Sequence, residues 1–119
     1  MSTTGYRTLQ VWQKAMDLVV ESYELSRRLP SHERYGLASQ LRRAAVSIPA
    51  NIAEGNGRMH RGEYVHHLSI ARGSLMELET HIEIAFRLEY LRADDLDKGR
   101  ELIDHVSRML NRLTARLRP

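Results

Sequence analysis

The sequence predicts an all-α fold: an antiparallel four-helix bundle with up-down-up-down topology. Four segments of the 119-residue chain carry apolar residues at alternating spacings of three and four, the period of an amphipathic helix. Short breaks separate the segments, and connections of that length make neighbouring helices antiparallel. Only seven residues are aromatic and three are proline, which favours helices over sheets.

The first predicted helix runs from about Arg7 to Leu29. Pro30 ends it, because proline disfavours a helical conformation in the residue before it, and Ser31 is then the expected N-cap of the next helix. We expect one domain over residues 6–118, preceded by a flexible N-terminus at residues 1–5. The expected core stripe of this helix is Leu9, Trp12, Met16, Val19, Tyr23 and Ser26.

The second predicted helix runs from about Arg34 to Glu54 and stops at Gly55 and Gly57. Pro49 lies inside it, where it removes a hydrogen bond and crowds the preceding turn, so we expect a kink there. The flanking Ser47 and Asn51 side chains can bond the freed backbone groups. Its core stripe is Leu37, Leu41, Ala45, Ile48 and Ile52.

The last two predicted helices run from about Gly62 to Leu88 and from Asp94 or Asp95 to Leu117. The third has the cleanest heptad pattern, without a slip. Its stripe is Tyr64, Leu68, Ala71, Leu75, Leu78, Ile82 and Ala85. The stripe of the fourth is Leu96, Gly99, Ile103, Val106, Leu110, Leu113 and Leu117.

Some apolar residues lie beside these stripes. Val11, Leu18 and Leu25 repeat every seven residues on the first helix, and Ile70 and Ile84 do so on the third. A monomeric bundle is not expected to expose so many apolar side chains, so we interpret them as a self-association surface. The alternative is a wide core stripe, which is ordinary for globular helices.

Charged residues suggest one structural contact within the bundle. Folding the second and third helices back about residue 59 places Arg42 and Arg43 level with Leu75 to Glu77. We therefore predict an ion pair between one of these arginines and Glu77, beside Gly73. Its expected role is structural rather than catalytic.

The chain carries a net charge of +3, and sixteen of its eighteen basic residues are arginine, a residue suited to bidentate phosphate contacts. Two groups stand out as candidate nucleic-acid contacts. Arg58 and Arg61 bracket the turn between the second and third helices. Arg108, Arg112 and Arg116 form a ridge on the fourth. The alternative reading of that ridge is charge that complements the dipole of a helix C-terminus.

Several classes of chemistry find no support in the sequence. The absence of cysteine excludes disulfides and thiolate metal sites. Glu63 and His66 have the Glu-x-x-His spacing of di-iron bundles, but there is no second copy. We therefore expect no enzyme activity, no cofactor or metal and no small-molecule substrate. Neither a signal peptide nor a membrane-length apolar run is seen, so a cytoplasmic location is expected.

Several motifs carry a family resemblance that covers about residues 6–117. They are Leu9-Gln10-Val11-Trp12 with Ala15, Tyr35-Gly36-Leu37, and the runs Gln40–Ala45, Ser47–Gly55 and Ile70–Glu79. Through them the chain resembles the bacterial four helix bundle protein family, also called the 23S rRNA intervening-sequence protein or S23-like family. The positions matching the family motifs, for which we expect structural roles, are Arg43, Pro49, Asn51, Glu54, Gly73 and Glu77.

The resemblance implies a four-helix bundle that assembles into a ring of five. A relative similar in fold, the accessory variability protein of diversity-generating retroelements, partners a reverse transcriptase and contacts nucleic acid through a basic surface. Five copies of a +3 chain would carry +15. Our leading hypothesis is a non-enzymatic homo-oligomer that binds RNA or a ribonucleoprotein. The second is a protein-interaction scaffold that uses the off-stripe apolar residues and the region around Pro49.

Overall fold

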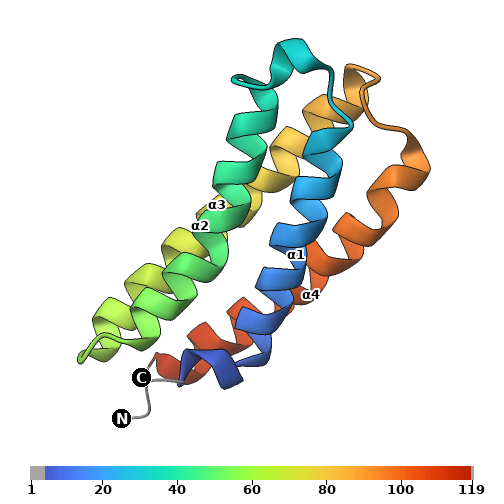
Figure 1. The fold of residues 1–119 in the computed structure, drawn as a ribbon. Coiled ribbons are helices and arrows are strands. Elements are labelled where there is room, and N and C mark those ends of the chain that lie inside the picture. Colours follow the sequence, from blue (N-terminus) through green and yellow to red (C-terminus); the bar gives the residue numbers. More distant parts are fainter. Residues whose placement is uncertain (1–4, 119) are drawn as a thin grey trace.

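The four apolar segments form four helices in the computed structural model, which describes residues 5–118. They are α1 (Gln10–Arg27), α2 (Leu37–Asn56), α3 (Arg61–Arg87) and α4 (Asp97–Leu117). Each helix runs opposite to the one before it, and α4 returns beside α1 (Figure 1). Short 3-10 turns at Tyr6–Thr8, Ser31–Glu33 and Ala93–Leu96 precede α1, α2 and α4. The predicted all-α, up-down-up-down bundle is confirmed.

The start of α2 differs from the expected Ser31 cap. Gly36 is the N-cap residue, and the carboxylate of Glu33 accepts the first backbone N–H of the helix. Glu33 Oε1 accepts the backbone N–H of Leu37 at 3.1 Å, and Oε2 accepts the Tyr90 hydroxyl at 3.0 Å. The bond from Leu37, and then the one from Tyr90, lowers the pKa of Glu33 below its usual value. The Glu33 bond in turn raises the pKa of Tyr90. This clamp ties the first turn of α2 to the segment after α3.

The predicted core stripes of α2, α3 and α4 lie on the inside of the bundle. Leu41, Leu75 and Val106, one from each helix, have no exposed surface at all. Helix α2 continues through the buried Pro49 without a break in its helical turns. The kink expected at this proline stays a prediction.

The predicted stripe of α1 is only partly right. Its Ser26 is buried, and Leu9, Trp12 and Val19 pack against the core, but the centre of the core face lies one residue away. Val11, Leu18 and Leu25 are at most 5% exposed and form the core face, whereas Met16 and Tyr23 are 38% and 37% exposed. The two stripes are one position apart in the sequence, roughly 100° around a helix with 3.6 residues per turn. Val11, Leu18 and Leu25 therefore cannot form the self-association surface that the sequence suggested.

The physical reason for this error is the composition of the buried stripe, which is diluted by Ala15 and Ser22. Small polar residues weaken an apolar pattern, but here they are satisfied locally. The Ser22 hydroxyl donates to the carbonyl of Leu18, and the Ser26 hydroxyl donates to that of Tyr23, both at 2.7 Å. Their burial therefore leaves no hydroxyl without a partner.

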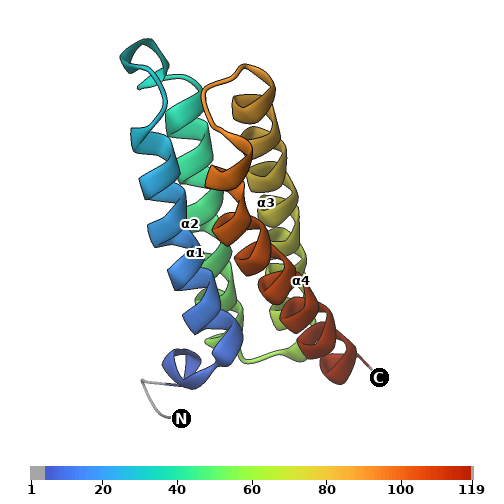
Figure 2. The same cartoon turned by 90° about the vertical axis from the view of Figure 1, so that its right-hand side faces the viewer.

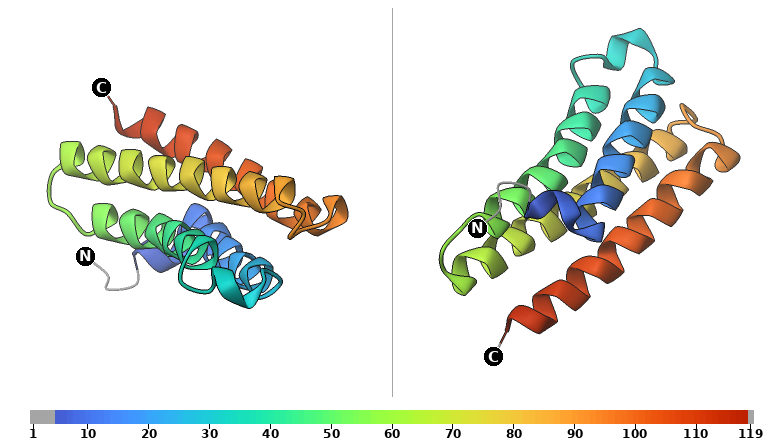
Figure 3. Two further views of the ribbon diagram at one scale, coloured as in Figure 1. Left: turned by 90° about the horizontal axis from the view of Figure 1, so that it is seen from above. Right: turned by 60° about the horizontal axis from the view of Figure 1, so that its bottom comes forward.

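Three chain segments meet at one end of the bundle: the start of α1, the α2–α3 turn and the end of α4 (Figures 2 and 3). The α1–α2 and α3–α4 connections lie at the opposite end. Of the expected flexible segment 1–5, all but Gly5 falls outside the described residues. Within residues 5–118, no helix is long and apolar enough to cross a membrane.

The α1 correction gives a direct test. Leu18→Ala should lower the free energy of unfolding by about 2–5 kcal/mol, because it removes a side chain from a filled core. Val20→Ala, at a position 64% exposed, should change it by no more than about 0.5 kcal/mol. Urea unfolding followed by circular dichroism measures both. A larger loss from Met16→Ala than from Leu18→Ala would contradict this assignment of the core face.

Candidate nucleic-acid interface

Positive charge gathers at the end of the bundle where the start of α1, the α2–α3 turn and the end of α4 meet. We call this region, residues 5–14, 54–65 and 108–118, the basic end (Figure 2). It holds eight basic and two acidic residues, a net charge of +6, while the whole chain carries +3. The remainder of the chain is therefore net negative. The fold thus separates the charge of a mildly basic chain, with the positive charge concentrated at one end of the bundle.

The three predicted ridge arginines of α4 are exposed but differ in their surroundings. Arg108 Nε lies 3.1 Å from the carboxylate of Asp104, so its charge is partly compensated. Arg112 and Arg116 have no carboxylate partner within residues 5–118. They line a hollow of about 290 Å³ against residues 8–11, at the start of α1. Arg112 and Arg116 are therefore the members of the ridge best placed to meet an anion.

The two predicted arginines at the α2–α3 turn also differ from each other. Arg58 is paired with Glu54 at 3.2 Å and with Glu63 at 3.7 Å, so two carboxylates offset its charge. Arg61 is exposed and has no such ion pair among the residues described. Arg61 is therefore the stronger candidate of the two for contact with phosphate.

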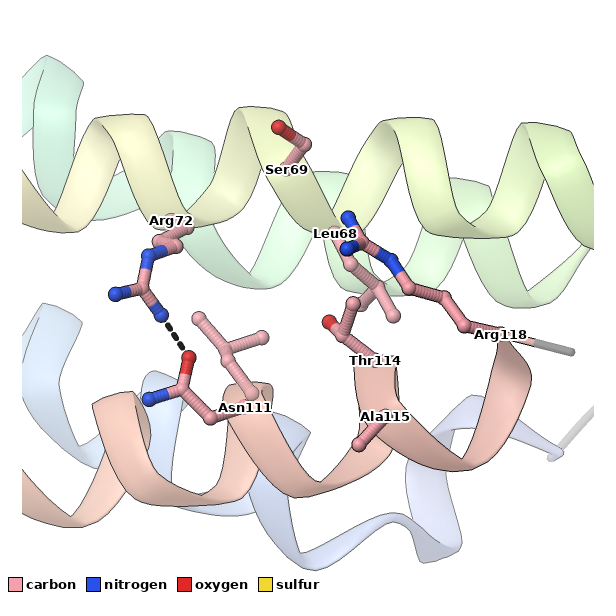
Figure 4. A pocket seen from close by; sticks show the side chains of 8 residues that line it. Leu68, Ser69, Arg72, Asn111, Thr114, Ala115 and Arg118 are labelled. Carbon is pink, nitrogen blue, oxygen red and sulfur yellow. Dashed lines mark hydrogen bonds between the residues drawn. The ribbon is translucent and has the colours of Figure 1, made fainter.

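A second hollow, of about 380 Å³, lies between α3 and α4 on the other flank of α4 (Figure 4). We call it the α3–α4 groove. Arg72 on α3 donates a hydrogen bond to Asn111 on α4, and Arg118 extends along the groove from the end of α4. Sequence reasoning missed Arg72 as a contact residue, because its position depends on how α3 and α4 face each other. The groove is lined by Leu68, Ser69 and Arg72 from α3 and by Leu110, Asn111, Thr114, Ala115 and Arg118 from α4 and its end.

A chain of hydrogen bonds joins α2 to α3 next to Pro49. The Ser74 hydroxyl donates to the Ser47 hydroxyl at 2.7 Å, and Asn51 Nδ2 donates to the Ser47 carbonyl at 2.8 Å. With its amide nitrogen used in this way, Asn51 presents Oδ1 to His67 Nδ1 at 3.0 Å. Since Oδ1 can only accept, His67 carries a proton on Nδ1.

The same chain ends at the basic end through Glu54. His67 Nε2 lies 3.4 Å from Glu54 Oε2, and the His67 side chain is only 13% exposed. Gly55 makes the close approach of the helices possible, because a Cβ there would lie 2.8 Å from His67 Cβ and 3.0 Å from Tyr64 Cδ1. The motif residues Asn51 and Glu54 thus join α2 to α3 through His67, a partner that the sequence analysis missed.

The predicted ion pair with Glu77 is wrong. Arg42 turns toward α1 instead of α3: its guanidinium lies 5.9 Å from the centre of the Tyr23 ring and donates to Ser26 Oγ at 3.4 Å. Arg43 and Glu77 are both exposed, and neither forms an ion pair within residues 5–118. Gly73 faces open space, with nothing within 4 Å of an added Cβ. The hairpin register alone did not fix the directions of these side chains.

The two remaining predicted interface residues lie on the outside of α3. Ile70 is 39% exposed and Ile84 is 40% exposed, and Leu88 on the same helix face is 52% exposed. Within residues 5–118 no three His, Cys, Asp or Glu side chains come together as a metal site. Glu63, of the Glu-x-x-His pair, contacts Arg58.

Comparison with known proteins finds a matching sequence family and a solved structure with a similar fold. The sequence model described as 23S rRNA-intervening sequence protein matches residues 7–112. A crystal structure from Bacteroides thetaiotaomicron VPI-5482, of a protein with unknown function from the S23 ribosomal protein family, is similar with a TM-score of 0.81. The identity is 23%, over 88% of this chain and 95% of that one, which shows a shared fold. No curated protein matches the chain.

Removing the central amide of the α2–α3 hydrogen-bond chain should be costly. Asn51→Ala leaves the Nδ1 proton of His67 without its acceptor, so we expect a loss of about 1–3 kcal/mol in the free energy of unfolding. Gln40→Ala, at an exposed position on the same helix α2, is the matched control and should cost no more than about 0.5 kcal/mol. Chemical unfolding of both variants decides the matter: equal losses would mean that the chain of bonds contributes nothing.

Proposed function

This chain belongs to the 23S rRNA-intervening sequence protein family, and we propose that it is a non-enzymatic, homo-oligomeric bundle that binds RNA or a ribonucleoprotein through its basic end. The observation that carries the proposal is the net charge of +6 on the basic end, in a chain whose total is +3. Arg61, Arg112 and Arg116 supply exposed guanidinium groups there without carboxylate partners among the described residues.

The spacing of the α4 arginines suits a polyanion with repeating charges. Residues four apart on a helix lie on one face and are separated by roughly 6 Å along the axis. Arg112 and Arg116 therefore form a short row of donors rather than one isolated charge. Guanidinium groups bind phosphate oxygens in a bidentate manner, and contacts of this kind give affinity that falls as salt rises.

The proposal assigns no reaction to this protein. Glu54, within the basic end, and His67, beside it, are bonded to each other and to Arg58 and Asn51 respectively. Those contacts join α2 to α3 and leave each group with a structural role. A binding function needs only the exposed arginines, which lie outside that network.

Self-association is the second part of the proposal, and the outer face of α3 supports it. Ile70 and Ile84, two heptads apart, are both exposed, with Gly73 between them. A glycine inside an exposed helix costs roughly 1 kcal/mol relative to alanine, and no contact within residues 5–118 accounts for it. The close approach of a second protein backbone at Gly73 would account for a glycine at this position. In the ring of five that the family resemblance implies, five basic ends would add their fields.

The alternative is a protein-interaction scaffold that does not bind nucleic acid. The observation that favours it is the outer face of α1, where Met16, Val20 and Tyr23 are 38%, 64% and 37% exposed. This apolar row replaces the Val11, Leu18 and Leu25 surface expected from the sequence. RNA association at the basic end and protein association through α1 are separable by mutation.

The RNA proposal predicts salt-sensitive binding that depends on α4. Arg112→Glu with Arg116→Glu should abolish association with RNA at moderate salt, since two phosphate contacts become repulsive. Arg34→Glu with Lys98→Glu, at the opposite end, changes the net charge equally and is the control. Fluorescence anisotropy of a labelled RNA, measured over a salt series, reports both. Equal weakening by both pairs would refute the assigned site, and a wild-type protein without affinity for RNA would favour the scaffold.

The assembly proposal predicts a change of mass in solution. The wild-type chain should run as an oligomer of this chain in light scattering coupled to size exclusion, with five copies as the expected number. Ile70→Glu with Ile84→Glu should give monomers, because it places two unpaired charges in the proposed contact. Val20→Glu on α1 should leave the mass unchanged. A monomeric wild-type protein, or dissociation caused only by Val20→Glu, would exclude the α3 face.

A further inference from the structure

The α3–α4 groove has an apolar floor and polar walls. Leu68 and Leu110 at its base are each 1% exposed, so they form a closed surface instead of a channel into the core. The side chains of Asn111 and Thr114 offer amide and hydroxyl groups toward α3, and Ser69 lies at the outer edge of α3 (Figure 4). A hollow of about 380 Å³ lies at the small end of the range for ligand sites. It suits one flat group and excludes a double helix.

The charge of the groove is entirely positive. Arg72 and Arg118 line it, and none of its other lining residues is charged. The hydrogen bond from Arg72 to Asn111 holds one guanidinium across the groove between the two helices. A guanidinium plane both binds phosphate and stacks on a nucleobase, so aromatic residues are not required for base contact.

The groove is continuous with the basic end. Arg61 precedes Arg72 by eleven residues, about three helical turns, so both lie on the same face of α3. Arg118 comes from the end of α4, and Arg112 and Arg116 occupy the opposite flank of the same helix. A strand that leaves the groove toward the turn therefore meets further guanidinium groups.

From these features we propose that the α3–α4 groove binds one unpaired nucleotide of an RNA strand, with its phosphate held by Arg72 and Arg118 and its base or ribose beside Thr114. This inference rests on the proposed RNA-binding function and adds that the RNA is single-stranded. The apolar floor favours a nucleotide over an acidic peptide, since a peptide carboxylate would use the arginines but not the floor. Asn111 and Thr114 are placed to bond ribose or base edges, a contact that a bare polyanion cannot use.

The test compares two double variants of equal net charge. Arg72→Glu with Arg118→Glu alters the groove, and Arg34→Glu with Lys98→Glu alters the opposite end. With a short unstructured RNA carrying a fluorescent label, the groove variant should bind at least about tenfold more weakly than the control. For single strands, the loss of two phosphate contacts should reduce the slope of log affinity against log salt by about 1.4. Circular dichroism confirms that both variants fold.

Competition with unlabelled polymers identifies the occupant. Single-stranded RNA should displace the label, whereas duplex RNA and poly-glutamate of equal charge should displace it poorly. Groove and control variants with equal affinities would overturn the inference, and the proposed function would stand if Arg112→Glu with Arg116→Glu still abolished binding. Equal competition by poly-glutamate or by duplex would overturn the nucleotide assignment. If the wild-type protein has no affinity for RNA, the inference and the proposed function fail together.

Discussion

The close packing of α2 on α3 is the contact on which the rest of the arrangement depends. Gly55 permits it, since any larger residue would meet His67 and Tyr64. The polar side chains between the two helices are hydrogen-bonded in sequence, from Ser74 through Ser47 and Asn51 to His67. Their burial therefore leaves no unpaired polar group in this series, which would be costly. The hydrogen bonds also fix the rotation of α3 about its axis. That rotation turns Arg72 toward α4 and leaves Ile70 on the outer surface.

The concentration of positive charge at the basic end lowers the stability of the fold, and the exposure of these side chains to solvent limits that loss. Placing eight basic residues at one end brings like charges together, and their repulsion opposes folding. The side chains involved are mostly exposed, where water and salt screen them. Glu54 and Glu63 compensate Arg58, which lies beside the tight α2–α3 contact. Arg112 and Arg116 lie on α4, outside the α2–α3 contact, so their charge does not burden that packing.

The sequence pattern predicts the four helices, their order and three of the four core faces. It succeeds for α3 because its large buried residues, Leu68, Leu75, Leu78 and Ile82, follow one unbroken heptad stripe with no second stripe of comparable size beside it. It is less accurate for α1, because this helix has two adjacent apolar stripes and either could form the centre of the core face. Only the packing of α2 and α4 determines which stripe does so. In the candidate site, too, the sequence predicts what depends on spacing along one helix but not what depends on packing between helices. The exposed arginines of α4 can be found from their spacing, whereas the groove requires knowing which flank of α4 faces Arg72.

The position of Trp12 has a practical consequence. It is the single tryptophan of the chain and lies within the basic end, with the Tyr6 ring 5.3 Å away and the Arg7 guanidinium 5.8 Å from its ring centre. The hollow that holds Arg112 and Arg116 is formed by the residues directly before it, from Thr8 to Val11. The protein therefore contains its own optical reporter beside the charged surface. Ultraviolet excitation of the unlabelled chain can follow events at that end, without signal from any other indole.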